Sequence, residues 1–271
     1  LTYGKKTMNF SHYQVITRSM KHLSMQFHGI TGTKDISKKE NKMNADFNVL
    51  FIASGNRLKK ISPIVTNQGE SLKKAGINID YYMIKGKGVW GYFKNITRLK
   101  KKINHGNYQI IHAHYSASGI LAFLTGKKPL IVSLMGSEVK PGKSYTILKW
   151  FIKYCWTKTI VKSNKMKTVL ALNNLITIPN GVNLDIFKPL SITKCKENLS
   201  WDTSQKHILF ASSPKRLEKN FSLAKNTLKL LNYKNLKIHY LENIPSDKIR
   251  THLNASDVIL LTSLREGSPN V

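Results

Sequence analysis

Short apolar runs alternate with amphipathic stretches from Phe47 onward, and this alternation predicts strands and helices in turn. In the first half of the chain, strands are expected at 48–54, 77–84, 108–114, 129–135 and 157–163, and the segment 175–182 closes this half. Helices are expected at 63–74, 90–104, 116–126, 146–156 and 164–171. Apolar strands separated by helices favour a parallel sheet that helices cover on both faces.

The second half repeats the pattern over a shorter length. Strands are expected at 207–213, 236–243 and 257–263, and helices at 221–232 and 245–256. The fold class is therefore α/β, with two Rossmann-like domains facing a cleft, at 47–190 and at 191–271. An average sheet has about five or six strands, whereas only three fit before Val271. We therefore expect the second domain, with its linker, to be incomplete.

Residues 1–46 follow neither a helical nor a strand period and end in a polar run. We expect them to form a disordered leader outside both domains. Met43 lies just before the first expected strand, so it is a candidate for the natural start of the protein.

Composition narrows the function classes. The chain has 44 Lys and Arg against 14 Asp and Glu, a net charge of +30, and 41% hydrophobic residues, enough for a folded core. Only six of the basic residues are arginine, the residue that base and bidentate phosphate recognition favour, so nucleic acid is not an expected partner. Such a surface still favours anionic partners.

The cysteine content and the hydropathy of the chain indicate the cellular compartment of the protein. Two cysteines, Cys155 and Cys195, cannot form a disulfide framework or a multi-cysteine zinc site. No apolar run approaches the roughly 20 residues that span a bilayer, and no signal peptide opens the chain. We therefore expect a cytoplasmic protein.

The loop after the strand at 207–213 carries candidate chemistry. Arg216 and Lys219 lie three residues apart, just before an expected helix. Two cations beside free backbone amides and a helix N-terminus suit a diphosphate. The alternative is that Arg216 and Lys219 are ordinary surface cations, because the chain is rich in lysine.

The loop at 265–271 follows another expected buried strand. Glu266 is one of few acids, and Gly267, Ser268 and Pro269 form an expected turn whose amides suit a sugar or phosphate. Ser268 and Pro269 are also typical of the N-cap and first residue of a helix. The two interpretations are compatible.

In this order, the motifs resemble those of the retaining glycosyltransferases of family 4, the glycosyl transferases group 1, which have the GT-B fold. The resemblance runs from about Phe47 to Val271. It is carried by IIHAHYSASGILA (110–122), PLIVSLMGSEV (129–139), IVKSNKMK (160–167), IPNGVNLDIFKP (178–189), SSPKRLEKNFSLA (212–224) and REGSPNV (265–271).

The resemblance implies a donor site in the second domain. Arg216 and Lys219 would hold the nucleotide diphosphate and stabilise the leaving group. Glu266 matches the first glutamate of the family's E-x(7)-E motif, which contacts the donor sugar. The turn against the sugar and phosphate would comprise Gly267, Ser268, Pro269 and Asn270. The acceptor side would comprise Gly136, Ser137 and Glu138, with His112 and His114 near the cleft.

The implied activity is transfer of a sugar, with retention, from a nucleotide-diphosphate sugar to a glycan or lipid-linked acceptor in cell-surface polysaccharide synthesis. The nucleotide sugar is a co-substrate, and no cofactor is expected. Such a transfer needs positioning and leaving-group stabilisation more than a strong base. The sequence has no DxD-like metal-binding pair, so a metal-independent reaction is expected.

Two departures from the family pattern matter. Met135 stands where many relatives have a histidine before the glycine of the acceptor loop, and this weakens the case for His112 or His114 in that role. The second glutamate of E-x(7)-E, which holds the nucleotide ribose in the family, would fall beyond Val271. We therefore expect this chain itself to bind donor poorly and to be inactive, and its complete parent to be active.

Aromatic and basic residues interleave in two expected helices. Trp150, Phe151, Tyr154 and Trp156 lie among lysines at 144–167, and Trp90, Tyr92 and Phe93 precede the run 100–102. Such helices can bind an anionic membrane surface, which would place the protein peripherally on the inner face of the cell membrane. The alternative is that the aromatic rings pack on the sheet and the lysines face water.

Three other functions compete with the transferase. The main alternative, from another class, is a basic non-catalytic binding protein that contacts nucleic acid or membrane through lysine charge. A nucleotide-sugar epimerase of the same fold fits the acceptor loop and the REGSPN turn less well. Glycoside hydrolysis usually needs a facing pair of carboxylates, and acids are sparse here.

Overall fold

The computed structural model describes residues 47–264 except 56–59, 87, 128, 140–141, 232 and 234. The chain divides into two units between Gly181 and Val182, earlier than the expected boundary at 190. The expected leader at 1–46 and the loop at 265–271 lie outside the described residues.

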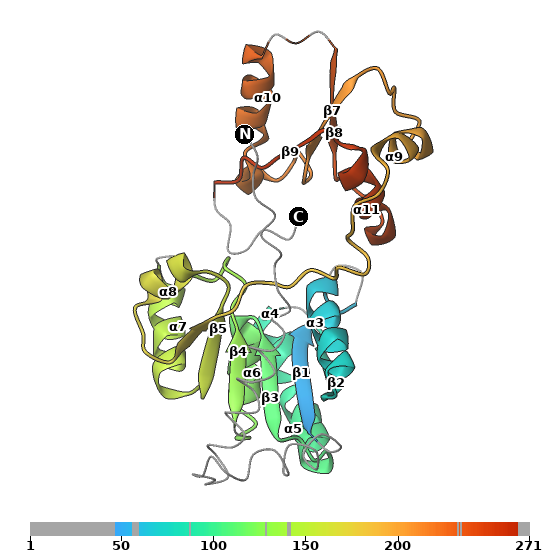
Figure 1. Ribbon diagram of the computed structural model, residues 1–271. Helices are drawn as coiled ribbons and strands as arrows, with labels where there is room; N and C mark the ends of the chain where they lie inside the picture. The colour runs from blue at the N-terminus through green and yellow to red at the C-terminus, as the bar shows by residue number, and fades with distance from the viewer. Residues whose placement is uncertain are drawn as a thin grey trace, which may run out of the picture. The chain divides into compact units, whose positions relative to one another are not determined.

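The first unit contains a parallel sheet with the strand order β2-β1-β3-β4-β5-β6 (Figure 1). Its strands are β1 (Asn48–Ser54), β2 (Asn78–Ile84), β3 (Ile110–His114), β4 (Leu130–Ser133), β5 (Lys158–Val161) and β6 (Leu175–Thr177). Its helices are α3 (Pro63–Lys74), α4 (Gly88–Phe93), α5 (Ile96–His105), α6 (Ser116–Phe123), α7 (Lys143–Tyr154) and α8 (Asn164–Leu170). The expected parallel α/β architecture is confirmed.

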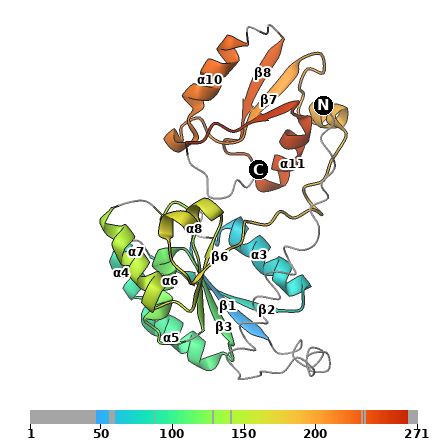
Figure 2. The same cartoon turned by 60° about the vertical axis from the view of Figure 1, so that its left-hand side comes forward.

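Helices cover this sheet on both faces, so its strands are apolar on both sides. Leu50 and Ile52 pack with residues of α5 to α8, whereas Val49 and Phe51 pack with residues of α3. Figure 2 shows α3 on one side of the sheet and α5, α6 and α7 on the other. All four side chains are fully buried, and each stabilises the fold by about 1.5–3 kcal/mol.

The expectation of one helix over 90–104 is wrong, because Asn95 separates α4 from α5. The amide of this buried side chain donates to the carbonyls of Lys85 and Gly91 and accepts from the Tyr82 hydroxyl. The Asn95 side chain thereby joins the turn after β2 to the end of α4. Sequence periodicity does not carry this long-range contact.

The second unit contains a smaller parallel sheet with the order β8-β7-β9. Its elements are α9 (Ile192–Asn198), β7 (Lys206–Phe210), the 3-10 turn η1 (Leu217–Lys219), α10 (Phe221–Leu230), β8 (Leu236–Tyr240), α11 (Ser246–Ala255) and β9 (Val258–Leu260). The strands are shorter than expected, and α9 lies in the segment expected to be a linker. Ile208, Leu209 and Phe210 of β7 are buried.

No helix among the described residues has the length and apolar character needed to cross a bilayer. Both cysteines, Cys155 and Cys195, are buried free thiols.

Candidate functional site

A glutamate clasp holds the loop after β4 against the start of α6. One carboxylate oxygen of Glu138 accepts a hydrogen bond from the Ser116 amide (2.5 Å), and the other accepts from the Met135 amide (2.7 Å). Burial raises the pKa of Glu138, although these bonds and one from the Gly136 amide oppose the rise. A carboxylate at a helix N-terminus satisfies amides that the helix leaves unbonded.

The hydrogen bonds of Glu138 thus hold the loop expected to bind the acceptor, Gly136 to Glu138, in one conformation. Gly136 has a φ of 108°, a conformation that glycine adopts without strain. Ser137 beside it is exposed, and Glu138 is partly buried. Because its carboxylate is bonded to the backbone, Glu138 is a positioning residue for the loop.

Two stacked histidines lie on one face of the sheet beside this loop. The imidazole rings of His112 and His114 are 4.4 Å apart between centroids, and His112 Nε2 lies 2.8 Å from Ser133 Oγ. Both side chains are fully buried, and neither ring nitrogen of His114 has a hydrogen-bond partner within the described residues. Burial lowers the pKa of His112 to about 3 and that of His114 well below its usual range. Both imidazoles are therefore neutral near pH 7.

Sequence reasoning missed a buried lysine at the same edge. Lys162 follows β5 directly and is only 3% exposed. Burial lowers the pKa of its ammonium to about 8, while the charge of Glu138 opposes the shift. Among the residues that the structure describes, no ion pair or hydrogen bond to this ammonium is found. Its place directly after a buried strand was the available signal.

The arrangement therefore brings His114, Gly136, Ser137 and Glu138 together at the carboxyl edge of the first sheet, with Lys162 added. Ligands of open α/β sheets bind at this edge. The exposed hydroxyl of Ser137 can hydrogen-bond a polar ligand at this edge, whereas the side chains of His114 and Lys162 are buried.

The second candidate cluster lies in the loop after β7. Arg216 precedes η1, and its Nε and Nη2 atoms donate to one carboxylate oxygen of Glu218 at 2.9 Å and 2.7 Å. Lys219 is the last residue of η1 and is partly buried. Both predicted diphosphate ligands are thus at the carboxyl edge of the second sheet, and the guanidinium of Arg216 is bound by a carboxylate.

The segment after β9 fixes this loop. The Thr262 hydroxyl contacts the carbonyl oxygens of Lys219 (3.0 Å) and Asn220 (2.9 Å), and the Leu264 amide donates to the Glu218 carbonyl (3.1 Å). The chain therefore passes beside η1 immediately before residue 265. Glu266, Gly267, Ser268, Pro269 and Asn270 themselves lie outside the described residues.

No group of three or more His, Cys, Asp or Glu side chains suited to a metal ion is found in the described part of the chain.

Comparison with known proteins found one matching family and several solved structures with a similar fold. Residues 64–186 match the family described as Glycosyltransferase Family 4. The match covers most of the first unit, and the chain has the two-domain α/β architecture of the GT-B fold. No curated protein sequence matches the chain.

Solved structures share the fold at low sequence identity. Sucrose-phosphate synthase from Thermosynechococcus elongatus is 13% identical, with a TM-score of 0.57 over 83% of this chain and 77% of that one. A glycosyltransferase from Rickettsia africae is 17% identical, with a TM-score of 0.52 over 81% and 74%. HepE from Anabaena, in complex with UDP and glucose, is 13% identical, with a TM-score of 0.54 over 82% and 76%.

A substitution at Glu138 tests whether its two hydrogen bonds hold the loop after β4 in place. Glu138→Gln replaces one of two acceptor oxygens with an NH₂ group that faces a backbone N–H. We expect the variant to lose about 1–3 kcal/mol of stability, the cost of an unsatisfied buried polar group. Urea denaturation of the first unit measures the loss.

Ser137→Ala is the matched control, since this neighbour is exposed. It should unfold with the wild-type midpoint. An unchanged midpoint for Glu138→Gln would show that the clasp does not hold the loop.

Proposed function

We propose that this protein is a glycosyltransferase that moves a sugar from a nucleotide-diphosphate sugar to a glycan or lipid-linked acceptor, with retention and without a metal ion. The observation that carries the proposal is the loop at the carboxyl edge of the second sheet, where Arg216 and Lys219 lie beside the segment at 262–264. Two cations at this edge match the charge of a diphosphate.

The chemistry follows from where charge develops. As the bond to the sugar breaks, negative charge builds on the leaving diphosphate, and preorganised cations stabilise it. Arg216 would exchange the Glu218 carboxylate for phosphate oxygens, because a guanidinium binds either group in a bidentate manner. Lys219 would add a second positive charge, and Glu266 would contact the donor sugar.

The acceptor would bind to the first unit, beside the loop that Glu138 holds. Ser137 supplies an exposed hydroxyl there, and Gly136 lets the backbone turn without strain.

The choice of probe follows from the comparisons. The similar HepE structures contain UDP and UDP-glucose, so UDP is the nucleotide to test first. Binding of UDP would also separate this proposal from the alternative of a basic, non-catalytic binding protein, which would need no site for a nucleotide.

The donor site gives a direct mutational prediction. Arg216→Ala removes charged hydrogen bonds worth about 1.5–3 kcal/mol, so we expect the Kd for UDP to rise about ten- to a hundredfold. Isothermal titration at millimolar UDP accommodates weak binding. Lys225→Ala, at an exposed position of α10, removes one positive charge elsewhere and should leave the Kd within about twofold.

Equal loss of UDP binding in both variants would mean that overall charge, rather than the loop, binds the nucleotide.

We also propose that the first unit binds the inner face of the cell membrane, which would suit a cytoplasmic enzyme of surface-polysaccharide synthesis. On α7, Trp150 is 53% and Tyr154 61% exposed, and on α4 Trp90 is 79% exposed. Trp156, in contrast, is buried in the core, and Phe151 packs against it, so part of the aromatic set serves the fold.

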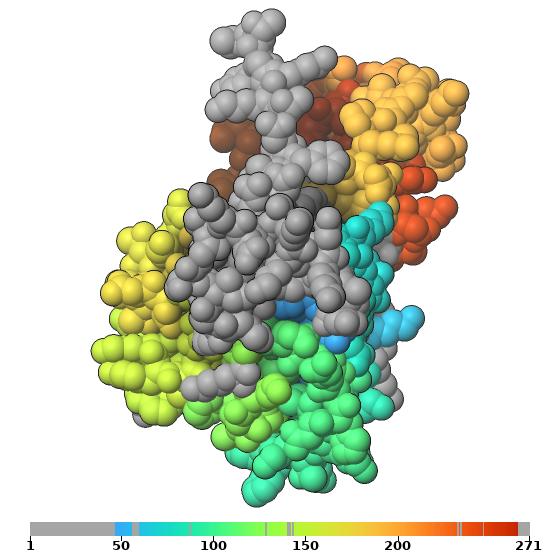
Figure 3. All heavy atoms as spheres, turned by 60° about the horizontal axis from the view of Figure 1, so that its bottom comes forward, coloured from blue at the N-terminus to red at the C-terminus, as the bar shows by residue number. Residues whose placement is uncertain are grey.

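Exposed lysines on α5 and α7 also support the proposal that this surface binds an anionic membrane. The lysines at 100 and 101 of α5 are exposed, as is Lys153 of α7. In Figure 3 the side chains around α5, coloured green, lie in the lower part of the view. Exposed tryptophan among lysines suits the interface of an anionic bilayer.

The double variant Trp90→Ser/Trp150→Ser tests this surface. We expect it to bind vesicles containing phosphatidylglycerol at least about tenfold more weakly than the wild type, because two interfacial anchors are removed while the charge is kept. Flotation at low salt measures the bound fraction.

The matched control is Leu230→Ser/Leu231→Ser in the second unit, where both leucines are exposed. This control should float with the wild type. Equal flotation of all three proteins would contradict the proposed surface.

A further inference from the structure

A glutamate at the carboxyl edge of the second sheet lies against the loop that carries Arg216. Glu242 follows β8, and its Oε1 atom accepts a hydrogen bond from the Ser213 hydroxyl (3.0 Å) and forms an ion pair with Lys215 Nζ (3.1 Å). Ser213 belongs to the loop after β7, and its hydroxyl in turn accepts from the Lys215 amide (3.2 Å). The carboxylate is therefore fixed beside the first residues of the loop proposed to bind the diphosphate.

The pairing of the two strands places this glutamate. β7 and β8 are parallel neighbours that end in register at Phe210 and Tyr240, and the Leu241 amide donates to the Phe210 carbonyl (3.2 Å). The loops after the two strands therefore begin side by side. Glu242 lies 22 residues after Asn220, the residue that precedes α10.

This arrangement matches that of nucleotide-binding βαβ units. In such a unit the first strand leads into the phosphate loop and then a helix. An acidic residue about 20 residues further on accepts a hydrogen bond from a ribose hydroxyl. Here β7, the loop with Arg216, α10 and β8 follow one another in that order, and Glu242 holds the position of the acidic residue.

Only one oxygen of the Glu242 carboxylate is engaged by the described residues. The side chain is 30% exposed, and no hydrogen bond or ion pair to its Oε2 atom is found in the part of the chain that the structure describes. The bonds from Lys215 and Ser213 hold the pKa of Glu242 below its usual range, so the group is ionised near pH 7 and only accepts hydrogen bonds. The charge of Lys215 also reduces repulsion between this carboxylate and a neighbouring diphosphate.

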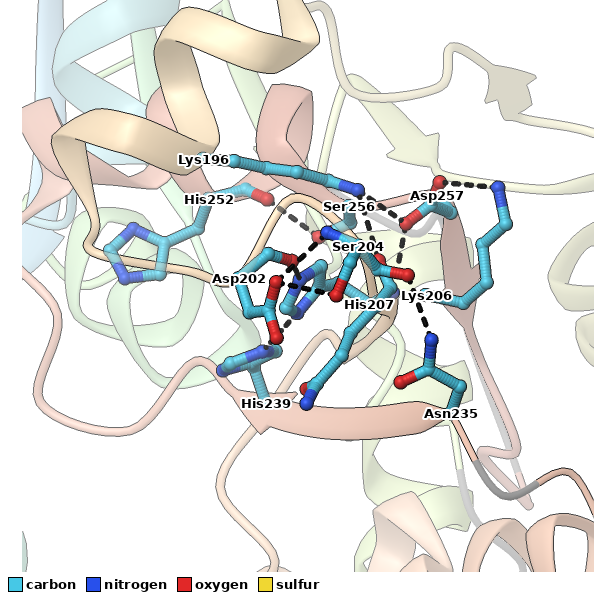
Figure 4. Close-up of polar contacts among 11 residues, drawn as sticks. Lys196, Asp202, Ser204, Lys206, His207, Asn235, His239, His252, Ser256 and Asp257 are labelled. Carbon is cyan, nitrogen blue, oxygen red and sulfur yellow. Dashed lines mark hydrogen bonds and ion pairs between the residues drawn. The ribbon is translucent and has the colours of Figure 1, made fainter.

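Asp257, at the amino edge of the same sheet, has both carboxylate oxygens engaged within the protein (Figure 4). Its Oδ2 atom is paired with Lys196 (3.0 Å) and accepts from the His207 amide (2.8 Å), and its Oδ1 atom lies 3.5 Å from Lys206. These contacts join α9 to the sheet. Asp257 is therefore a structural residue, whereas Glu242 has an oxygen that a ligand can use.

We propose that Glu242 recognises the nucleoside of the donor, and that its carboxylate accepts hydrogen bonds from the ribose hydroxyls. The inference rests on the donor site proposed at Arg216 and Lys219, and it extends that site from the diphosphate to the ribose. Glu242 is distinct from the glutamates of the E-x(7)-E motif, which come later in the sequence.

A nucleotide without ribose hydroxyls tests this contact. 2′,3′-Dideoxy-UDP keeps the base and the diphosphate of UDP. We expect the wild-type chain to bind it about tenfold or more weakly than UDP, because hydrogen bonds to a charged group are lost. Chemical-shift titration of the ¹⁵N-labelled chain measures both Kd values, including those in the millimolar range.

The variant Glu242→Ala should lose this preference, so that its two Kd values agree within about twofold. Each comparison uses two ligands on the same protein, so a change in stability or net charge does not alter the ratio. Glu242→Gln keeps a neutral acceptor oxygen, so its preference should fall at least about threefold, and this variant serves if Glu242→Ala does not fold. The control Glu197→Gln, at an exposed position of α9, should keep the wild-type preference.

Inorganic diphosphate separates recognition of the ribose from a purely structural role. It has no ribose, so in Glu242→Ala its Kd should rise at least about threefold less than the Kd for UDP. Equal rises for the two ligands would overturn the inference, because Glu242 would then only hold the loop.

Two further results would overturn it. One is equal wild-type affinity for UDP and 2′,3′-dideoxy-UDP, and the other is a Glu242→Ala variant that keeps the wild-type preference. Both leave the proposed donor site intact, because UDP still binds. Absence of UDP binding by the wild type would instead contradict the donor site itself, and this inference with it.

Discussion

Burial of the first sheet on both faces decides where polar chemistry can lie in that unit. The strands are parallel, and helices cover both sides, so the interior positions are apolar: Val49, Leu50, Phe51 and Ile52 are fully buried. Polar groups can enter such a layer only where a strand ends or where a partner compensates them. The loops at the strand ends, in particular the carboxyl ends, therefore carry the candidate sites.

Backbone hydrogen bonds hold these loops in place. In the first unit, Glu138 connects the loop after β4 with the start of α6. In the second, Thr262 and Leu264 connect the end of β9 with η1. Both arrangements position a loop through main-chain atoms, and in the second unit the exposed side chain of Arg216 lies on the loop that is held. A preorganised site of this kind loses less entropy when its ligand binds.

The sequence was sufficient for the order of elements, because apolar runs and their spacing are local properties. It also placed Arg216 and Lys219 at a strand end, where the structure has them. The break in the helix at Asn95, the clasp of Glu138 and the buried ammonium of Lys162 were not predictable in this way. Each depends on contacts between segments that are distant in sequence, such as Glu138 with Ser116.

The stacking of Trp201 on His239 shows the same limit. Trp201 lies in a segment expected to be a linker and His239 lies on β8, so only the fold brings the two rings together. The carboxyl edge of the second sheet offers the candidate donor site, which is where ligands of open α/β sheets commonly bind.

The most direct test of the account is amide hydrogen exchange of the chain with and without saturating UDP. If the nucleotide binds at the carboxyl edge of the second sheet, as proposed, peptides covering 211–220 and 261–264 should exchange more slowly with UDP. Peptides covering 199–207 at the opposite edge should be unchanged. Protection confined to 199–207, or none at 211–220, would contradict the assignment of the donor site.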